Sequence, residues 1–120
     1  MVEFVIVLPV MLFLIFMIAY AGIGFERYAR VTNAARVAAR AAAVARFDGL
    51  DPCIAAEQAA DNALDGLTLD GPPQCDSVPP GLAPGSLLTV TLQYTLPSIP
   101  LITGIIGPTT VTGKATERME

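Results

Sequence analysis

Two cysteines are the residues of this 120-residue chain with the most specific chemistry. Cys53 and Cys75 are its only cysteines, and it has no histidine. An isolated pair in a short domain behind an apolar segment predicts a disulfide and an oxidising, extracytoplasmic compartment. The crosslink would close a loop of about 23 residues and stabilise the fold by roughly 3 kcal/mol in the chain-entropy account. Two buried free thiols are the alternative, and two cysteines without histidine are too few for a structural zinc site.

Glu3 is the second residue whose chemistry needs an explanation. It stands at the front edge of an apolar run, and no charged residue occurs between Phe4 and Phe25. A carboxylate near hydrocarbon is costly unless it is paired or lies at the water edge. Spacing alone favours the water edge, with Glu3 close enough to the end of the run to reach lipid headgroups.

The remaining side chains do not form an evident catalytic or metal site. The sequence has no histidine, no isolated reactive cysteine and no glycine-rich phosphate loop, so we predict no enzymatic activity and no cofactor. Asp48 and Asp51, or Asp65 and Asp70, lack the ligand count and spacing of an EF-hand. These acids are better explained as helix caps and as solvated residues of turns.

The apolar run after Glu3 is long enough to cross a membrane. At about 1.5 Å per helical residue, Phe4 to Phe25 spans roughly 33 Å, close to the thickness of a bilayer's hydrocarbon core. One alternative is a signal peptide cleaved after Ala21, which would release a small secreted disulfide-bonded domain. The run has no basic segment before it and is long for a signal, which argues against cleavage. A generic single-pass membrane protein is a further alternative.

The helix predicted from this run continues beyond the membrane. No glycine or proline interrupts the Ala- and Arg-rich segment from residue 26 to Gly49, which is the expected C-cap. Pro9 lies inside the run, where lipid-embedded helices tolerate proline. We therefore expect one helix over about residues 3–47. The chain divides into its transmembrane part (1–25), its extracytoplasmic continuation (26–47) and a small head (48–120).

Alanines dominate the outer half of this predicted helix. Small side chains let another helix approach closely, which suits packing against copies or relatives of the chain. The stripe can equally pack on its own domain, and both can hold. The candidates for helix packing are Ala35, Ala38, Ala39 and Ala42.

The head is predicted to be α+β. Asp51 and Pro52 begin a helix over about 52–65, which Gly66 can end. Its apolar face is thin, and residues 69–86 read as a Pro/Gly-rich loop. Two segments alternate with period two and should pair as antiparallel strands against the long helix. The apolar face of the first strand is predicted to be Leu88, Val90, Leu92, Tyr94 and Leu96. The polar face of the second strand is predicted to be Thr110, Thr112, Lys114 and Thr116. The residues of the helix over 52–65 that follow helical spacing are Ile54, Ala55, Gln58, Ala59, Asn62 and Ala63.

An apolar stretch over residues 97–108 separates these two strands. It contains more isoleucine and leucine than an ordinary exposed loop, so it either joins the small core or forms a patch for a neighbouring subunit or lipid. About 95 residues remain beside the membrane run, which bury only a modest core. We therefore expect the head to need a crosslink or a neighbouring subunit.

Charge is distributed unevenly along the chain. Residues 26–46 hold five Arg against one Glu, whereas residues 48–120 hold nine acids against two bases, Lys114 and Arg118. The acidic outer part argues against nucleic acid as a partner. The basic collar beside the run suits anionic lipid headgroups or acidic neighbours, or it simply keeps an Ala-rich helix soluble.

Taken in order, these segments resemble a TadE-like protein, a minor pilin or pseudopilin of the tight-adherence (Tad/Flp) pilus machinery. The resemblance rests on "VEFVIVLP" opening the apolar helix, "NAARVAARAAAV" continuing it, the later cysteine pair, "LTVTLQYTLP" and the terminal "VTGKATERME". It covers nearly the whole chain. The ordered set is more specific than any single piece.

The resemblance implies a pilin-like fold and a life history. Such proteins are made with a short basic leader, which a prepilin peptidase removes on the cytoplasmic side. The mature protein waits in the inner membrane until an ATPase and a membrane platform assemble pilins into a filament. Other pilin subunits, the assembly machinery and membrane lipid are therefore the expected partners. TadE-like members are thought to initiate, cap or assist assembly.

The front of the chain departs from this pattern. Met1 precedes Glu3 by two residues, without a basic leader or a cleavage site. A start recorded too late, a missing precursor segment or an unprocessed protein would each explain this. The arginines that follow the run would place the carboxy-terminal part in the cytoplasm by the positive-inside rule, whereas the cysteines indicate the opposite side. A basic leader upstream would restore the balance.

The resemblance also gives Glu3 a second interpretation. In pilin-like proteins the equivalent acid is thought to meet the amino-terminal amine of a neighbouring subunit, which neutralises both charges in the filament core. Glu3 is therefore the candidate residue for subunit assembly. Contact with headgroups and water remains the alternative.

Overall fold

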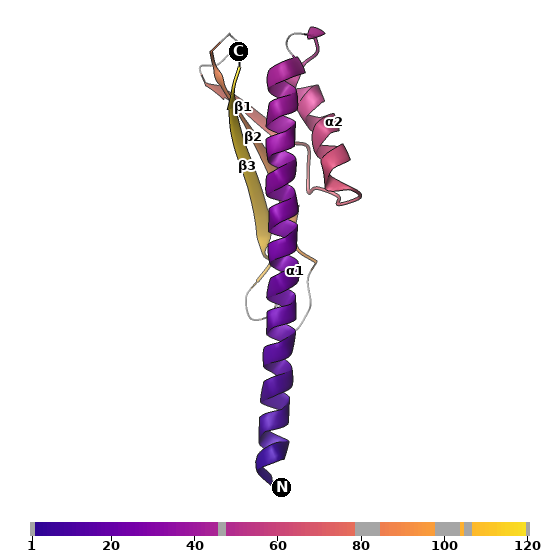
Figure 1. Cartoon of the computed structure of the whole chain (residues 1–120), viewed down its shortest axis with the longest axis vertical. Coiled ribbons are helices and arrows are strands. Elements are labelled where there is room, and N and C mark those ends of the chain that lie inside the picture. Colours follow the sequence, from indigo (N-terminus) through magenta and orange to yellow (C-terminus); the bar gives the residue numbers. More distant parts are fainter. Residues whose placement is uncertain (1, 46–47, 79–84, 98–103, 105–106, 120) are drawn as a thin grey trace.

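A single helix, α1 (Val2–Ala45), forms the axis of the molecule in the computed structural model (Figure 1). The structure describes residues 2–45, 48–78, 85–97, 104 and 107–119. At about 1.5 Å per residue, the 44 residues of α1 account for most of the longest extent of 72 Å. The expected long helix is thus confirmed over the described residues, and Pro9 lies within it.

The carboxy-terminal end of this helix is closed by a glycine, as the sequence predicts. Gly49 adopts a φ of 69°, a left-handed conformation that costs glycine little. The Leu50 amide donates a hydrogen bond of 3.1 Å to the Ala45 carbonyl. A six-residue bond of this kind around a left-handed glycine is the closing bond of a Schellman motif.

Helix α2 (Pro52–Leu64) begins as predicted but buries a different face. The Asp51 carboxylate accepts a hydrogen bond of 2.9 Å from the Cys53 amide, and Pro52 occupies the first turn. The helix ends with Asp65, not glycine, as the left-handed C-cap; Gly66 follows with positive φ. The predicted apolar face was wrong. The alanines of α2 occur on several sides of the helix, so their spacing does not identify the side that is buried. The buried residues are Pro52, Ala56, Ala60 and Leu64.

Three antiparallel strands form one sheet in the order β1-β2-β3. The predicted pair is confirmed as β2 (Leu87–Thr95) and β3 (Thr110–Arg118), with Thr91 opposite Lys114. The sheet has a further strand, β1 (Gln74–Val78), in the segment predicted to be a loop. That prediction was wrong because QCDSV is short, lacks alternation of apolar and polar residues, and lies between proline-rich segments.

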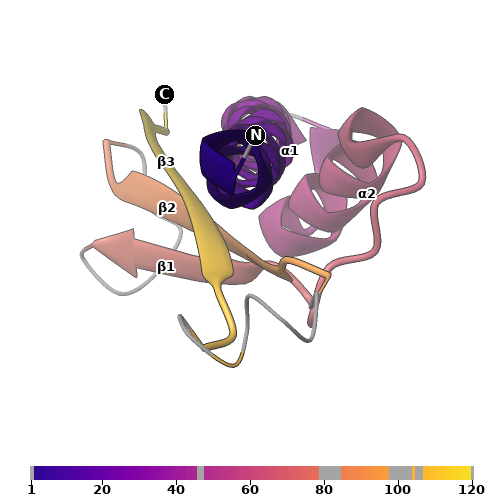
Figure 2. The same ribbon diagram turned by 90° about the horizontal axis from the view of Figure 1, so that it is seen from below.

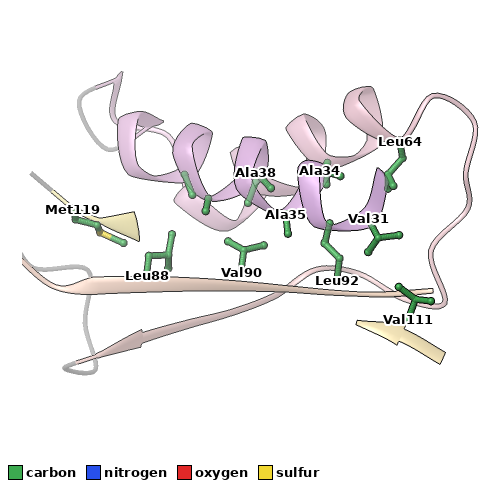
Figure 3. Packing of buried hydrophobic residues seen from close by; sticks show 14 of the residues in the cluster. Val31, Ala34, Ala35, Ala38, Leu64, Leu88, Val90, Leu92, Val111 and Met119 are labelled. Atoms are coloured by element: carbon green, nitrogen blue, oxygen red, sulfur yellow. The ribbon is translucent and has the colours of Figure 1, made fainter. Parts of the chain in front are cut away.

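Helix α1 contacts both other layers of the head. Figure 2 shows the sheet and α2 on different sides of α1, and the contacts of α1 with α2, β2 and β3 agree. Leu88, Val90 and Leu92 of β2 point toward the helix (Figure 3), as their alternation predicts. The outer half of α1 is therefore the central element of the small core.

Helix α1 and strand β3 come unusually close at Gly113. A Cβ atom built on Gly113 would lie 2.7 Å from the Val31 carbonyl oxygen, well inside normal contact distance. Glycine within a strand often marks such an approach of two backbones. Gly113 therefore sets how closely β3 packs across α1.

Candidate functional site

The amino-terminal half of α1 is a large uncovered apolar surface. Every residue from Glu3 to Ala19 is exposed, including Phe4 at 71% and Ile18 at 72%. The most apolar part of the helix has a mean hydropathy of 2.8 and none of it is buried, so its length and composition suit a membrane span. Monomeric soluble proteins rarely expose so large an apolar surface.

Glu3 lies in the first turn of α1, and its side chain is exposed. A carboxylate is favoured at this position because the first turn carries the positive end of the helix dipole. Among the residues that the structure describes, the ion pair is that of Arg30 with Glu26, at 2.8 Å on successive turns of α1. Glu3 therefore has no cationic partner within the described part of this chain.

The sheet brings the two cysteines together. Cys53 lies in the first turn of α2, and Cys75 lies in β1, whose pairing with β2 carries it to the start of that helix. Both are half-buried, free thiols in this structure. Partial burial raises the pKa of the Cys75 thiol to about 12, helped by a hydrogen bond with the Cys53 side chain. The predicted neighbourhood of the two residues is thus present, and the bond between them remains a prediction.

The alanine stripe is covered by the chain's own head. Ala35, Ala38, Ala39 and Ala42 are completely buried and belong to the same cluster as Ala60. This is one of the two alternatives that the sequence left open. A neighbouring subunit would therefore meet other residues of α1 in this folded chain.

The expected role of the apolar stretch between β2 and β3 concerns residues that lie outside the described part of the chain, namely Ile99, Leu101, Ile102, Ile105 and Ile106.

Over the described ranges, no group of three or more His, Cys, Asp or Glu side chains is placed to hold a metal ion.

Sequence reasoning missed two features of the head. Gly113 carried a usable signal, because a glycine inside an alternating strand suggests a close backbone approach. The second is a groove between α1 and β3, lined in part by Arg36, Arg40 and Lys114. No sequence signal indicates this groove, since it depends on how β3 lies across the helix.

A comparison with protein families finds a match at the amino-terminal end. The family described as "TadE-like protein" matches residues 1–40, a third of the chain. No curated protein and no solved structure matches the chain. The matched segment contains Glu3, the whole apolar half of α1 and the first three alanines of the buried stripe. The family that the sequence resembles is thus the one whose model matches, and the first 40 residues of the chain are similar to TadE-like proteins.

Proposed function

We propose that the protein is a membrane-anchored minor pilin or pseudopilin that takes part in assembling a Tad/Flp-type pilus. The observation that carries this proposal is the combination of a fully exposed apolar half-helix with a folded head on the same rod. The TadE-like match covers that half-helix, and TadE-like proteins are associated with Tad pilus systems. In this proposal the chain has no catalytic role.

The proposed location is the inner membrane, with a single span and the head on the extracytoplasmic side. Phe25 and Tyr28 are exposed where the apolar run meets the charged part of α1. Aromatic side chains are favoured at membrane–water interfaces, so these two suit the outer boundary of the span. The mature head then stands outside the membrane, and incorporation would carry it into the extracellular pilus.

The cysteine pair supports an extracytoplasmic head, and we propose that Cys53 and Cys75 form a disulfide there. An oxidised dithiol protein of that compartment would exchange its disulfide with the two thiols. The chain loses two electrons and two protons, and the donor's disulfide is reduced to two thiols. Alkylation under denaturing conditions, before and after reduction, measures the outcome. Two thiols that are alkylated without reduction would contradict the disulfide.

Assembly in this proposal depends on helix packing between subunits. The exposed apolar half of α1 leaves the lipid and packs against the corresponding helices of other pilin subunits. Glu3 then meets the amino-terminal amine of a neighbour, because an unpaired carboxylate in such an apolar filament core would be strongly disfavoured. A prepilin peptidase is the expected processing enzyme where a leader precedes the chain.

The decisive substitution is Glu3→Gln, which removes the charge and keeps the size. We expect normal membrane insertion and at least a tenfold loss of pilus assembly or of co-purification with partner pilins, as roughly 1.4 kcal/mol or more of pairing energy would be lost. Asp48→Asn is the matched control, because Asp48 is an exposed carboxylate of the head. Normal assembly with Glu3→Gln would remove Glu3 from the mechanism.

Mass measurement of the mature chain tests the anchor itself. Retention of the apolar run through Ala21 is expected for an anchored pilin. A mature chain that starts at Gly22 would instead support the secreted domain and contradict the proposed function.

A further inference from the structure

A groove runs along the head between the outer face of α1 and the edge strand β3. Its volume is about 910 Å³, and Val37, Ala41, Val44 and Ala115 contribute apolar side chains to its lining. Val37 and Val44 are each about half exposed, at 50% and 53%. The groove therefore presents uncovered apolar surface on the part of the molecule that lies beyond the proposed span.

Three cations line this groove. Arg36 and Arg40 are one helical turn apart on α1, and Lys114 faces the groove from β3; Glu117 is the acid among the lining residues. None of the three cations forms an ion pair with another described residue, since the ion pair in that part of the chain is Arg30–Glu26. An apolar lining flanked by unpaired cations suits an amphipathic helix that carries a row of acids.

The chain itself carries such a helix. The exposed side of α2 bears Glu57 and Asp61, and Asp65 follows at its C-cap, so three acids recur at every fourth position. Ile54 on the same side is 56% exposed, and α2 contains no basic residue. Four helical residues rise about 6 Å, so the acids of α2 and the pair Arg36–Arg40 have matching spacings.

The groove and α2 lie beside the same stretch of α1 but on different sides of it. Figures 1 and 2 show α2 on one side of the helix and β3 on another, and both border its outer half. One molecule therefore cannot fill its own groove with α2. A second copy standing parallel in the same membrane would bring its α2 to the groove at a similar height.

We propose that the groove between α1 and β3 binds the acidic outer face of α2 from a second copy of this chain. The contact joins two different surfaces, so in a pair one copy keeps a free α2 and the other a free groove for further neighbours. Arg36 lies 11 residues beyond Phe25, or about 16 Å along the helix, which favours a protein over lipid headgroups as the occupant. The inference rests on the proposed function in one respect, the shared membrane that holds the copies parallel.

The single lysine of the chain allows a position-specific test. Lys114 lines the groove, and a carbodiimide joins an amine to a carboxylate only when the two are in contact. We would insert nitrogen-15-labelled and unlabelled full-length chains together into phosphatidylcholine vesicles and crosslink them. The expected product is a mixed-isotope crosslink from Lys114 to Glu57, Asp61 or Asp65. Lys114→Arg keeps the charge of the groove and should remove the product.

Two charge reversals test the complementarity. Arg36→Glu with Arg40→Glu in the groove, or Glu57→Arg with Asp61→Arg on α2, should each lower the crosslink yield at least about tenfold, because like charges then face each other. A mixture of the two variants should restore the crosslink. Isotope labelling should show that the restored crosslink joins Lys114 of the α2 variant to Glu57, Asp61 or Asp65 of the groove variant. Arg30→Glu with Arg118→Glu is the control, since it makes the same charge change outside the groove.

Several outcomes would overturn the inference. One is a wild-type crosslink from Lys114 only within a chain, or only to acids outside Glu57, Asp61 and Asp65 of another copy. Full crosslinking by the groove variant alone is a second. An inserted chain with no crosslink between copies would overturn this inference and leave the proposed function intact. A chain that fails to remain with the vesicles would overturn both.

Discussion

At the scale of single residues, Cys75 is the group whose ionisation the fold changes most clearly. Its thiol is half-buried in β1 beside Cys53, and the acids Asp51 and Asp76 also disfavour a negative charge there. Burial is the largest of these effects and raises the pKa of the Cys75 thiol to about 12. At neutral pH the reduced protein therefore holds Cys75 as a protonated thiol, which is a poor nucleophile.

This shift makes the stability of the reduced protein depend on alkaline pH. The thiol has a pKa near 9.0 when unfolded and about 12 when folded, so the folded state holds its proton more tightly. The contribution to stability is complete below pH 9 and declines as the pH rises from 9 toward 12. We expect the free energy of unfolding of the reduced chain to fall more steeply between pH 8 and pH 10.5 than that of Cys75→Ser.

Urea unfolding in the presence of a reductant measures this difference. The comparison with Cys75→Ser isolates the effect of this thiol, because the two proteins share every other ionisable side chain. Parallel pH dependence of the two proteins would contradict the raised pKa of Cys75. The oxidised chain should lack the decline caused by this thiol, because a disulfide has no proton to lose.

At the scale of elements, the two halves of one helix have different surroundings. The first half of α1 is apolar on all sides and uncovered, whereas its second half buries a stripe of alanines under α2 and the sheet. Alanine has almost no side-chain entropy to lose and lets a neighbouring element approach the helix backbone closely. The sheet uses this closeness where Gly113 of β3 crosses Val31.

The close crossing predicts that Gly113→Ala destabilises the head. The added methyl group would meet the Val31 carbonyl oxygen at 2.7 Å, and neither backbone can move aside without disturbing its own hydrogen bonds. We expect a loss of about 1–3 kcal/mol in the free energy of unfolding, as is typical of overpacking. Thermal or chemical unfolding of the two proteins measures the loss.

Gly71→Ala is the matched control for this substitution. An added Cβ at Gly71 would meet no atom within 4 Å, and its φ lies outside the left-handed region. The control should therefore change stability by no more than about 0.5 kcal/mol. Equal stability of Gly113→Ala and Gly71→Ala would show that β3 does not press on α1 as described.

At the scale of the whole molecule, the chain combines a long apolar run, the amino-terminal half of α1, with a folded head. The described core extends from Val31 to Met119 and includes no residue of the apolar run. Near the end of the run, a Cβ added at Gly22 would meet no atom within 4 Å, whereas one added at Gly24 would lie 3.8 Å from the Leu96 side chain. The apolar run therefore contributes little to the packing of the head.

Removal of residues 1–25 should accordingly leave a chain, residues 26–120, that is folded and water-soluble. Residues 26–45 retain the buried stripe, so the truncated chain keeps every layer of the core. Circular dichroism with cooperative thermal unfolding and size-exclusion chromatography in detergent-free buffer test this expectation. The same truncation with Leu92→Asp is the control, because a carboxylate buried in this core should prevent folding. Aggregation or non-cooperative melting of the unmodified truncation would contradict the prediction.

Local patterns in the sequence were sufficient for the two halves of α1, the start of α2 and the β2–β3 pair. Each of these depends on nearby residues: an uncharged run, a helix without glycine or proline, a capping Asp51, or alternation in a strand. Strand β1 could not be predicted because it is held by pairing with β2, not by a pattern of its own. The buried face of α2 was missed for a related reason, since alanines on several sides leave the choice to the neighbouring layers.

The sequence by itself therefore determined the class of the molecule: an apolar run long enough to span a membrane, its continuation as a helix, an α+β head and a resemblance to TadE-like proteins. Only the tertiary structure decided which partners the elements have. It covered the alanine stripe with the chain's own head, brought Cys75 beside Cys53, and opened a cationic groove between α1 and β3. The physical reason is that periodicity and capping act within a few residues of the chain, whereas burial and charge proximity arise between segments that only the fold brings together.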